Sequence, residues 1–351
     1  MQSEEKLQNY LHKMVGELGA VATAPLVVTG DRLGLYKAIA DNGPVTAAQL
    51  AEKTGTNERY IREWLSAQAA SGYVDYDAQS NSFSMNPEQQ AVFADESSPY
   101  FMTGAFYSIG SVYTDEPALT AAFTTGEGIG WGDHHGCLFC GTAKFFRPSY
   151  QANLVSSWLT SLEADVVGKL TKGGKVADVG CGYGISTVLM AEAFPNSTFV
   201  GYDFHESSIE EARKNAEKAG VTNVTFEVAT AKDYPGENYD LVTFFDCLHD
   251  MGDPAGAAAH VRQSLSDDGT WMIVEPAAGD TLADNINPVG RVYYAFSTAV
   301  CTPSSLSQEV GAALGAQAGE ARLREVITAG GFGRVRRASE TPFNIVLEAR
   351  P

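Results

Sequence analysis

The run Val176-Ala177-Asp178-Val179-Gly180-Cys181-Gly182-Tyr183-Gly184 decides the fold. Its first residues, 176–179, are mostly apolar and predict a short buried strand. Glycines at 180, 182 and 184 then form a turn, and residues 185–194 (ISTVLMAEAF) predict a helix. A strand, a glycine turn and a helix in this order bring bare backbone against a ligand at the carboxyl end of the strand. Turns of this kind bind nucleotides in doubly wound sheets.

The spacing of the glycines indicates which ligand to expect. Dinucleotide-binding folds use G-x-G-x-x-G, with a pyrophosphate at the helix N-terminus. Here the order is D-x-G-x-G-x-G, and the carboxylate of Asp178 would repel a phosphate but suit an ammonium group. The next predicted strand, 197–202, leads into Asp203, whose carboxylate can accept hydrogen bonds from two ribose hydroxyls. Together these features resemble the S-adenosylmethionine site of a class I methyltransferase.

Length and composition set the broad class. The chain has 351 residues, enough for two domains, and its content of 44% hydrophobic and 19% charged residues allows a sizeable core. The net charge of −19 gives an acidic surface, which repels nucleic acid and anionic lipid. We therefore expect no nucleic-acid partner and a solvated enzyme.

Cysteine usage and the N-terminus indicate the compartment. The five cysteines (137, 140, 181, 247 and 301) are odd in number and form no disulfide framework, which suggests a reducing environment. The N-terminus has no basic region followed by an apolar core, and no uncharged run approaches the roughly 20 residues that span a bilayer. We expect a cytoplasmic protein without a membrane partner.

The first forty residues predict two helices. Leu7, Leu11, Met14 and Leu18 recur at spacings of three and four, which predicts an amphipathic helix over 1–22. A second helix is expected after Pro25, up to about residue 40. A leading helix with nothing before it to pack on often crosses to a second subunit, so we expect a homodimer.

Residues 43–85 predict a winged helix-turn-helix. Thr46 is a helix N-cap and Gly55 ends that helix. Thr56 or Asn57 caps the next helix, which ends at Gly72, and two short strands follow at 73–76 and 81–85.

Two roles compete for this winged helix. As a DNA reader it would place helix 57–71 in the major groove, but Arg59 and Arg62 are accompanied by Glu58 and Glu63, and the segment 40–90 has few basic residues. The stretch resembles the dimerisation and substrate-shaping module of small-molecule methyltransferases.

An aromatic connector occupies residues 91–150, and its aromatic side chains are either core or the lining of an apolar pocket. Within it, His134, His135, Cys137 and Cys140 have the chemistry of zinc ligands, but no second separated ligand pair lies nearby. We expect no metal; the segment is either a glycine-hinged lid whose histidines face the active site or a solvated loop.

A further cluster precedes the second domain. The sequence 142–162 is expected to be helical after Pro148, and Phe146, Arg147 and Tyr150 lie in it. Arg147 or Tyr150 could meet the carboxylate of the cofactor, since arginine binds carboxylates bidentately. An interface between domains is the alternative role.

From residue 170 strands and helices alternate, as in a doubly wound, mostly parallel α/β sheet. The predicted strands are 176–180, 198–203, 223–228, 239–246, 269–275, 332–339 and 342–349. The predicted helices are 185–194, 206–219, 254–266 and 319–330, with an insert at 277–317. Only about two residues join the last two strands, so the final strand must run antiparallel. Seven strands with one reversed strand are the Rossmann-like sheet of the class I methyltransferases.

Ligands of such sheets lie outside the carboxyl ends of the strands, which names the candidates for cofactor binding. They are Asp178, Gly180, Cys181, Gly182, Asp203, Phe204, Thr230, Ala231 and Asp246. Phe204 is placed to pack on adenine. Members of the resembled family often have an acid at the position of Thr230, so here Asp233 or a backbone carbonyl could take that contact.

The proton acceptor is expected just after the fourth predicted strand. The run Leu248-His249-Asp250-Met251-Gly252-Asp253 is similar to the H-D-W-x-D run of small-molecule O-methyltransferases, in which this histidine is the base. An imidazole of ordinary pKa near 6.5 suits that role. Glu275, at the end of the fifth strand, matches an acid of the same family and could orient His249. The alternatives are a helix cap for His249 and a solvated strand end for Glu275.

These features predict three regions: helices and winged helix (1–98), connector and lid (99–165) and catalytic domain (166–351), the last with a substrate-cap insert at 277–317. The layout resembles actinobacterial two-domain methyltransferases, which implies S-adenosylmethionine as cofactor and S-adenosylhomocysteine as product. The expected substrate is a small, largely apolar acceptor, methylated on oxygen. The alternative function is an S-adenosylmethionine-sensing transcription regulator.

Overall fold

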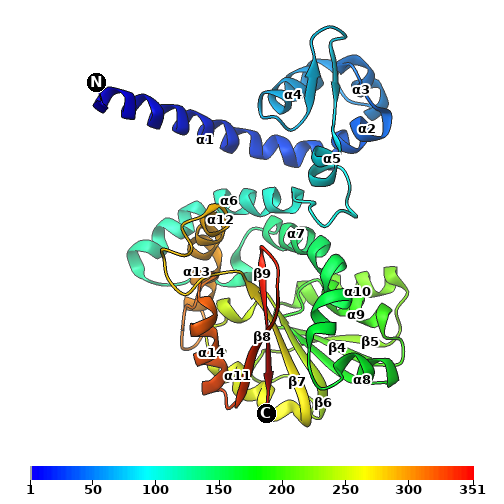
Figure 1. Cartoon of the computed structure of the whole chain (residues 1–351), viewed down its shortest axis with the longest axis vertical. Coiled ribbons are helices and arrows are strands. Elements are labelled where there is room, and N and C mark those ends of the chain that lie inside the picture. The colour runs from blue at the N-terminus through cyan, green and yellow to red at the C-terminus, as the bar shows by residue number, and fades with distance from the viewer. Residues whose placement is uncertain (1) are drawn as a thin grey trace. The chain divides into compact units, whose positions relative to one another are not determined.

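The computed structural model describes residues 2–351 (Figure 1). The chain forms two compact units, one of residues up to 111 together with 140–149, the other of residues 112–139 and 150–351. The expected connector, 99–165, contributes to both units. Its two long helices, α6 (Thr103–Thr125) and α7 (Cys137–Asn153), each run from one unit into the other.

The first helix passes through a proline. The sequence predicted a break near Pro25, but α1 runs without interruption over Gln2–Arg32, so that prediction was wrong. Pro25 lies on the exposed side of the helix, where water can bond the carbonyl that a proline leaves without its donor. On the other side Thr23, Ala24 and Val27 are buried and hold the helix together.

Helix α1 is also long and apolar. Ser3–Arg32 is long and apolar enough to cross a membrane. Signal sequences and buried helices of soluble proteins meet the same criterion of length and composition. Only 17% of its most apolar window is buried. The expected absence of a membrane segment therefore stays a prediction.

The winged helix has the expected elements. They are α2 (Leu35–Asn42), α3 (Ala47–Thr54), α4 (Glu58–Ala70), β1 (Asp75–Asp77), β2 (Ser82–Ser84) and α5 (Pro87–Phe93). Thr46 and Gln49 form a capping box on α3, and Asn57 caps α4. Strands β1 and β2 pair antiparallel, and Leu35, Ile39, Leu50 and Leu65 are buried in the core between the helices.

The larger unit is built on a seven-stranded sheet (Figure 1). Its strands are β3 (Lys175–Val179), β4 (Thr198–Asp203), β5 (Val224–Val228), β6 (Tyr239–Phe245), β7 (Leu265–Pro276), β8 (Arg334–Glu340) and β9 (Asn344–Arg350). The spatial order is β5-β4-β3-β6-β7-β9-β8. Strands β3 to β7 pair parallel with their neighbours, and β9 is antiparallel to both β7 and β8, as expected.

Helices cover both faces of this sheet. They are α8 (Val166–Lys172), α9 (Ile185–Ala193), α10 (Glu206–Ala219), α11 (Pro254–Ser264) and α14 (Gly319–Ala329). Figure 1 shows α9 and α10 on one face, with α11 and α14 on the other. The insert at 277–317 contains α12 (Pro288–Phe296), a π-helical turn (Ser297–Cys301) and α13 (Thr302–Leu306).

Helix α7 begins earlier than expected. It starts at Cys137 and continues through Pro148, so the prediction of a helix only after Pro148 was wrong. Cys137 and Cys140 therefore lie in its first turn rather than in an extended loop. The chain continues as a π-helical turn (Leu154–Trp158) and a 3-10 turn (Leu159–Ser161).

Candidate active site

The glycine turn between β3 and α9 has a left-handed backbone at all three glycines. The φ angles of Gly180, Gly182 and Gly184 are 72°, 51° and 71°. A Cβ on Gly180 would lie 2.7 Å from Cys247 Sγ, and one on Gly184 would lie 2.7 Å from the Phe226 ring. A Cβ on Gly182 would meet no atom of the described chain within 4 Å. Gly182 is therefore the position where bare backbone faces open space.

Asp178 lies beneath this turn and is almost fully buried. Ser186 Oγ and Thr187 Oγ1 donate to its Oδ2 at 2.7 and 2.6 Å, and Thr243 Oγ1 donates to Oδ1 at 2.9 Å. Burial raises the pKa of Asp178 to about 6, although the three hydroxyls act to lower it. The carboxylate thus ties β3 to the first turn of α9 and to β6. The predicted contact of the Asp178 carboxylate with an ammonium group stays a prediction.

Asp203 joins the end of β4 to the glycine turn. Its Oδ2 accepts the Gly182 N–H and its Oδ1 accepts the His205 N–H, both at 2.9 Å. A carboxylate can accept about four hydrogen bonds, so each oxygen keeps capacity for another donor. Burial raises the pKa of Asp203, while the two backbone N–H groups lower it. Next to it the Phe204 side chain is 51% exposed, an unusual state for an aromatic ring at a strand end.

The end of β5 carries no carboxylate in the expected position. Thr230 N and Oγ1 instead donate to Asp233 Oδ1 at 2.9 and 2.6 Å. These bonds hold the pKa of Asp233 below its usual range. Asp233 therefore stabilises the loop that contains Thr230 and Ala231.

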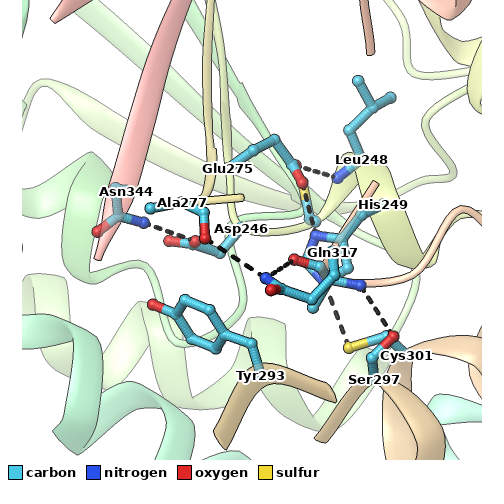
Figure 2. A network of polar contacts seen from close by, with 12 residues as sticks. Asp246, Leu248, His249, Glu275, Ala277, Tyr293, Ser297, Cys301, Gln317 and Asn344 are labelled. Atoms are coloured by element: carbon cyan, nitrogen blue, oxygen red, sulfur yellow. Dashed lines mark hydrogen bonds and ion pairs between the residues drawn. The ribbon is translucent and has the colours of Figure 1, made fainter. Parts of the chain in front are cut away.

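His249 and Glu275 are brought together in a buried pair (Figure 2). His249 lies in a 3-10 turn (Leu248–Asp250) after β6, and Glu275 lies near the end of the neighbouring β7. His249 Nδ1 is 2.6 Å from Glu275 Oε2, and the Leu248 N–H donates to Oε1 at 2.9 Å. Burial acts to lower the pKa of His249, but the charges and hydrogen bonds of Glu275 and Cys301 together outweigh it and raise this pKa well above 6.5.

The other ring nitrogen of His249 contacts a cysteine of the insert. Its Nε2 lies 3.3 Å from Cys301 Sγ (Figure 2). No sequence pattern singled out Cys301, because the insert has no regular periodicity and the cysteine is 52 residues away from His249. Glu275, His249 and Cys301 thus form a chain of contacts from carboxylate to imidazole to thiol.

Asp246 lies just beyond β6 and has the left-handed φ of 50°, which aspartate tolerates better than most residues. Tyr150 Oη donates to its Oδ2 and Asn344 Nδ2 to its Oδ1, both at 2.8 Å. Burial, followed by the charge of Glu275, raises the pKa of Asp246 to about 8. Tyr150 thus bonds a carboxylate of the protein, and its expected contact with the cofactor stays a prediction.

The segment that contains the paired histidines is a folded part of the larger unit. His134 is buried, with Nδ1 3.0 Å from Asp115 Oδ2, whereas His135 is exposed and accepts the Cys137 N–H at 3.2 Å. Among residues 2–351 no three His, Cys, Asp or Glu side chains are placed to hold a metal ion.

The same segment packs next to Asp203 and the insert. The Phe139 ring lies 4.7 Å from the His205 ring, and Leu138 is buried with Ala299 and Val300. The Ile129 N–H donates to the Pro303 carbonyl at 3.0 Å. The segment therefore packs against His205, just beyond β4, and against the insert, and its expected role as a lid stays a prediction.

Two other candidate residues lie in the smaller unit. The Phe146 ring packs edge-on against Phe145 at 5.1 Å, and Arg147 is exposed on α7. In the winged helix, Arg59 and Arg62 of α4 pair with Glu63 and Glu58, each at 2.6 Å. The basic groups that a DNA reader would present are thus matched by carboxylates of the same helix.

The comparisons with known proteins agree with this geometry. A family model described as "Methyltransferase domain" matches residues 170–320, and one described as "Rv2258c-like winged HTH domain" matches residues 21–94. This part of the chain, 170–320, is an S-adenosylmethionine-dependent methyltransferase domain. The expected methyltransferase domain with an N-terminal winged helix is thereby confirmed.

Curated relatives match about a third of the chain. The chain is 33% identical over 131 residues to the ubiquinone biosynthesis O-methyltransferase of Thiobacillus denitrificans, which covers 36% of this chain and 52% of that protein. It is 34% identical over 133 residues to the enzyme of the same name in Leptothrix cholodnii, covering 37% and 53%. The chain thus spans about half the length of these relatives.

Solved structures match over nearly the whole chain. Human N-acetylserotonin methyltransferase in complex with SAM has a TM-score of 0.67 at 15% identity, over 100% of this chain and 98% of that one. An O-methyltransferase family protein from Burkholderia thailandensis has a TM-score of 0.68 at 15% identity, over 97% and 98%. At such identities the likeness concerns the fold, and it agrees with the predicted Rossmann-like sheet and N-terminal winged helix.

Proposed function

We propose that the chain is an S-adenosylmethionine-dependent methyltransferase that methylates an oxygen atom of a small, largely apolar acceptor. The observation that supports this most is the buried pair His249–Glu275 at the same sheet edge as the glycine turn and Asp203. Parallel strands bring both features to their carboxyl ends, where such sheets bind ligands.

The residues at the turn fit the proposed cofactor. Asp203 has acceptor capacity for ribose hydroxyls, Phe204 offers an exposed ring for adenine, and Gly182 leaves room for close approach of a ligand. Asp178 holds the turn in shape through Ser186 and Thr187. When bound, S-adenosylmethionine supplies a methyl group on a positively charged sulfur, and S-adenosylhomocysteine is left as product.

His249 is the proposed proton acceptor. An ionised carboxylate only accepts hydrogen bonds, so Glu275 fixes the proton of the ring on Nδ1 and leaves Nε2 to act as base. A phenol, with an ordinary pKa near 10, needs such help to become a good nucleophile at neutral pH. Holding the acceptor oxygen in line supplies much of the remaining rate.

The surroundings of the base favour an apolar acceptor. Leu138, Ala299 and Val300 form a buried cluster, and Trp131, Phe139 and Phe296 pack against it. Ala299 and Val300 directly precede Cys301, which contacts His249. The apolar and aromatic cluster is therefore joined directly, through the chain, to the residue that contacts the base.

Replacing the base tests the proposal. We expect His249→Gln to lower kcat on a phenolic acceptor by about 10²- to 10⁴-fold, the usual contribution of a general base, while calorimetry shows unchanged binding of S-adenosylhomocysteine. His260→Gln is the control. His260 lies in α11, its Nε2 contacts the Tyr234 carbonyl at 2.9 Å, and the residue has no part in the proposed site. Equal turnover of the His249→Gln enzyme would exclude the base role.

The homodimer expected from the sequence is part of this proposal. On α1 the side chains of Leu7, Leu11 and Leu18 are 55%, 47% and 69% exposed and recur at helical spacing. An apolar stripe of this kind is typical of a helix that packs against another chain.

A further inference from the structure

Cys301 has the neighbours of an activated thiol. Its Sγ lies 3.3 Å from His249 Nε2, while His249 Nδ1 lies 2.6 Å from Glu275 Oε2. A nucleophile, a base and a group that orients the base are the three parts by which thiols are activated in enzymes of unrelated folds. All three side chains are buried, so their mutual interactions are little screened by water.

Two other cysteines of the larger unit provide a contrast. Cys181 is 7% exposed and Cys301 is 8% exposed, but within residues 2–351 no imidazole contacts Cys181. Burial, followed by the charges of Asp203 and Asp178, raises the pKa of Cys181 well above its usual value. The pKa of Cys247 is likewise raised by burial and by Glu275, and its Sγ contacts the Val179 carbonyl. Of these three thiols, only Cys301 has a base at its sulfur.

We propose that Cys301 is a covalent modification site for small uncharged electrophiles, activated by His249 and Glu275. The thiol passes its proton to His249 Nε2, and Glu275 stabilises the resulting imidazolium. With iodoacetamide as the electrophile, the thiolate sulfur attacks the carbon that bears iodine, a C–S bond forms, and iodide leaves with the electrons of the C–I bond. The proton stays on Nε2.

The site favours electrophiles without negative charge. Three carboxyl groups interact electrostatically with His249, namely Asp246 just beyond β6, Asp250 in the 3-10 turn and Glu275 in β7, and the chain carries a net charge of −19. The charge of Glu275 and the net charge of the chain repel anions such as iodoacetate, and Asp246 and Asp250, whose pKa values are raised to about 8 and about 7, add to this repulsion only as they ionise.

Modification would also stop the proposed methyl transfer, and this consequence rests on the function proposed above. The thiol occupies the space at Nε2, the atom that is to take the proton of the acceptor. A group added to the sulfur would stay there, so the acceptor oxygen could not reach the base. The acceptor and the electrophile therefore compete for one position.

The test is the rate at which iodoacetamide alkylates each cysteine of the full-length protein at pH 7.5. Mass spectrometry of the peptides measures this rate. We expect Cys301 to react at least about tenfold faster than the equally buried Cys181, since the thiolate is the reactive form. His249→Gln and Glu275→Gln should each reduce the Cys301 rate by about tenfold or more, the second because an amide at Nδ1 turns Nε2 into a donor. Far-ultraviolet circular dichroism and thermal unfolding confirm that the variants are folded.

Equal rates for Cys301 and Cys181 in the unaltered protein would overturn the proposal, as would a Cys301 rate that neither variant lowers. Labelling requires no turnover, so this result is independent of the methyltransferase assay. A chain that labels quickly but methylates nothing would contradict the proposed function and leave the activated thiol in place.

Discussion

At the scale of single residues, the chemistry depends on the contact between His249 and Glu275. The 2.6 Å separation between Nδ1 and Oε2 fixes the tautomer, and the carboxylate raises the pKa of the ring well above 6.5. A base is active only when deprotonated, so a raised pKa moves the active form to higher pH. The neighbouring carboxyl groups of Asp246 and Asp250 titrate near neutrality too, with pKa values of about 8 and about 7.

The pH dependence of the rate tests this contact. We expect kcat/KM for a phenolic acceptor to rise with pH through an apparent pKa above 6.5, because kcat/KM follows the free enzyme. Glu275→Gln should lower that apparent pKa and reduce the rate by about tenfold or more. Glu217→Gln, on the exposed side of α10, should leave the profile unchanged. A profile that is the same with and without the Glu275 carboxylate would exclude the orienting role.

At the scale of elements, the turn between β3 and α9 decides how closely a ligand can approach. Gly180 and Gly184 are needed for packing against Cys247 and Phe226, but a Cβ on Gly182 would meet only open space. If the cofactor occupies that space, the Cβ of an alanine at position 182 would lower the affinity for the cofactor and would also strain the backbone.

Two glycine substitutions separate these effects. Gly182 and Gly220 both have positive φ, 51° and 73°, and a Cβ added to either would meet no described atom within 4 Å, so alanine should cost each about 1 kcal/mol of stability. Gly220 ends α10, away from the turn. We expect Gly182→Ala to weaken S-adenosylhomocysteine binding by about tenfold or more, and Gly220→Ala to leave it unchanged. Equal calorimetric affinities for the two variants would place the cofactor elsewhere.

Most elements could be predicted from the sequence because their signals are local. The glycine turn, the caps at Thr46 and Asn57 and the alternation after residue 170 each depend on a few neighbouring residues. The helices through Pro25 and Pro148 could not be predicted, since tertiary packing overrides the local preference against proline.

The candidate site shows the same division. His249 and Glu275 could be paired from the sequence because His249 follows β6 and Glu275 lies near the end of β7, the neighbouring parallel strand. Asn344 was missed because it begins an antiparallel strand, whose start reaches the edge where its neighbour β7 ends, opposite Pro276. Cys301 was missed because the insert that contains it has no regular pattern.

At the scale of the whole molecule, α1 has an exposed apolar stripe of Leu7, Leu11 and Leu18. Burying apolar surface contributes about 25 cal/mol of free energy per Å², which makes association of such a stripe favourable. The proposed partner is a second copy of the chain.

Light scattering after size-exclusion chromatography tests the dimer. We expect twice the 37.4 kDa chain mass for the full-length protein and a single chain mass for the Leu11→Glu/Leu18→Glu variant, in which two charges interrupt the stripe. Lys13→Glu reverses a charge outside the stripe, and this variant should stay dimeric. A full-length chain that elutes as a monomer at tens of micromolar would contradict the dimer.

The measurement that tests the central claim most directly is calorimetric titration of the full chain with S-adenosylmethionine, S-adenosylhomocysteine and a nicotinamide dinucleotide. We predict one site per chain for the two sulfur nucleosides, with affinity lowered about tenfold or more by Asp203→Asn, which weakens a charged acceptor, and no binding of the dinucleotide. Binding of the dinucleotide alone would contradict the account of the glycine turn and of everything built on it.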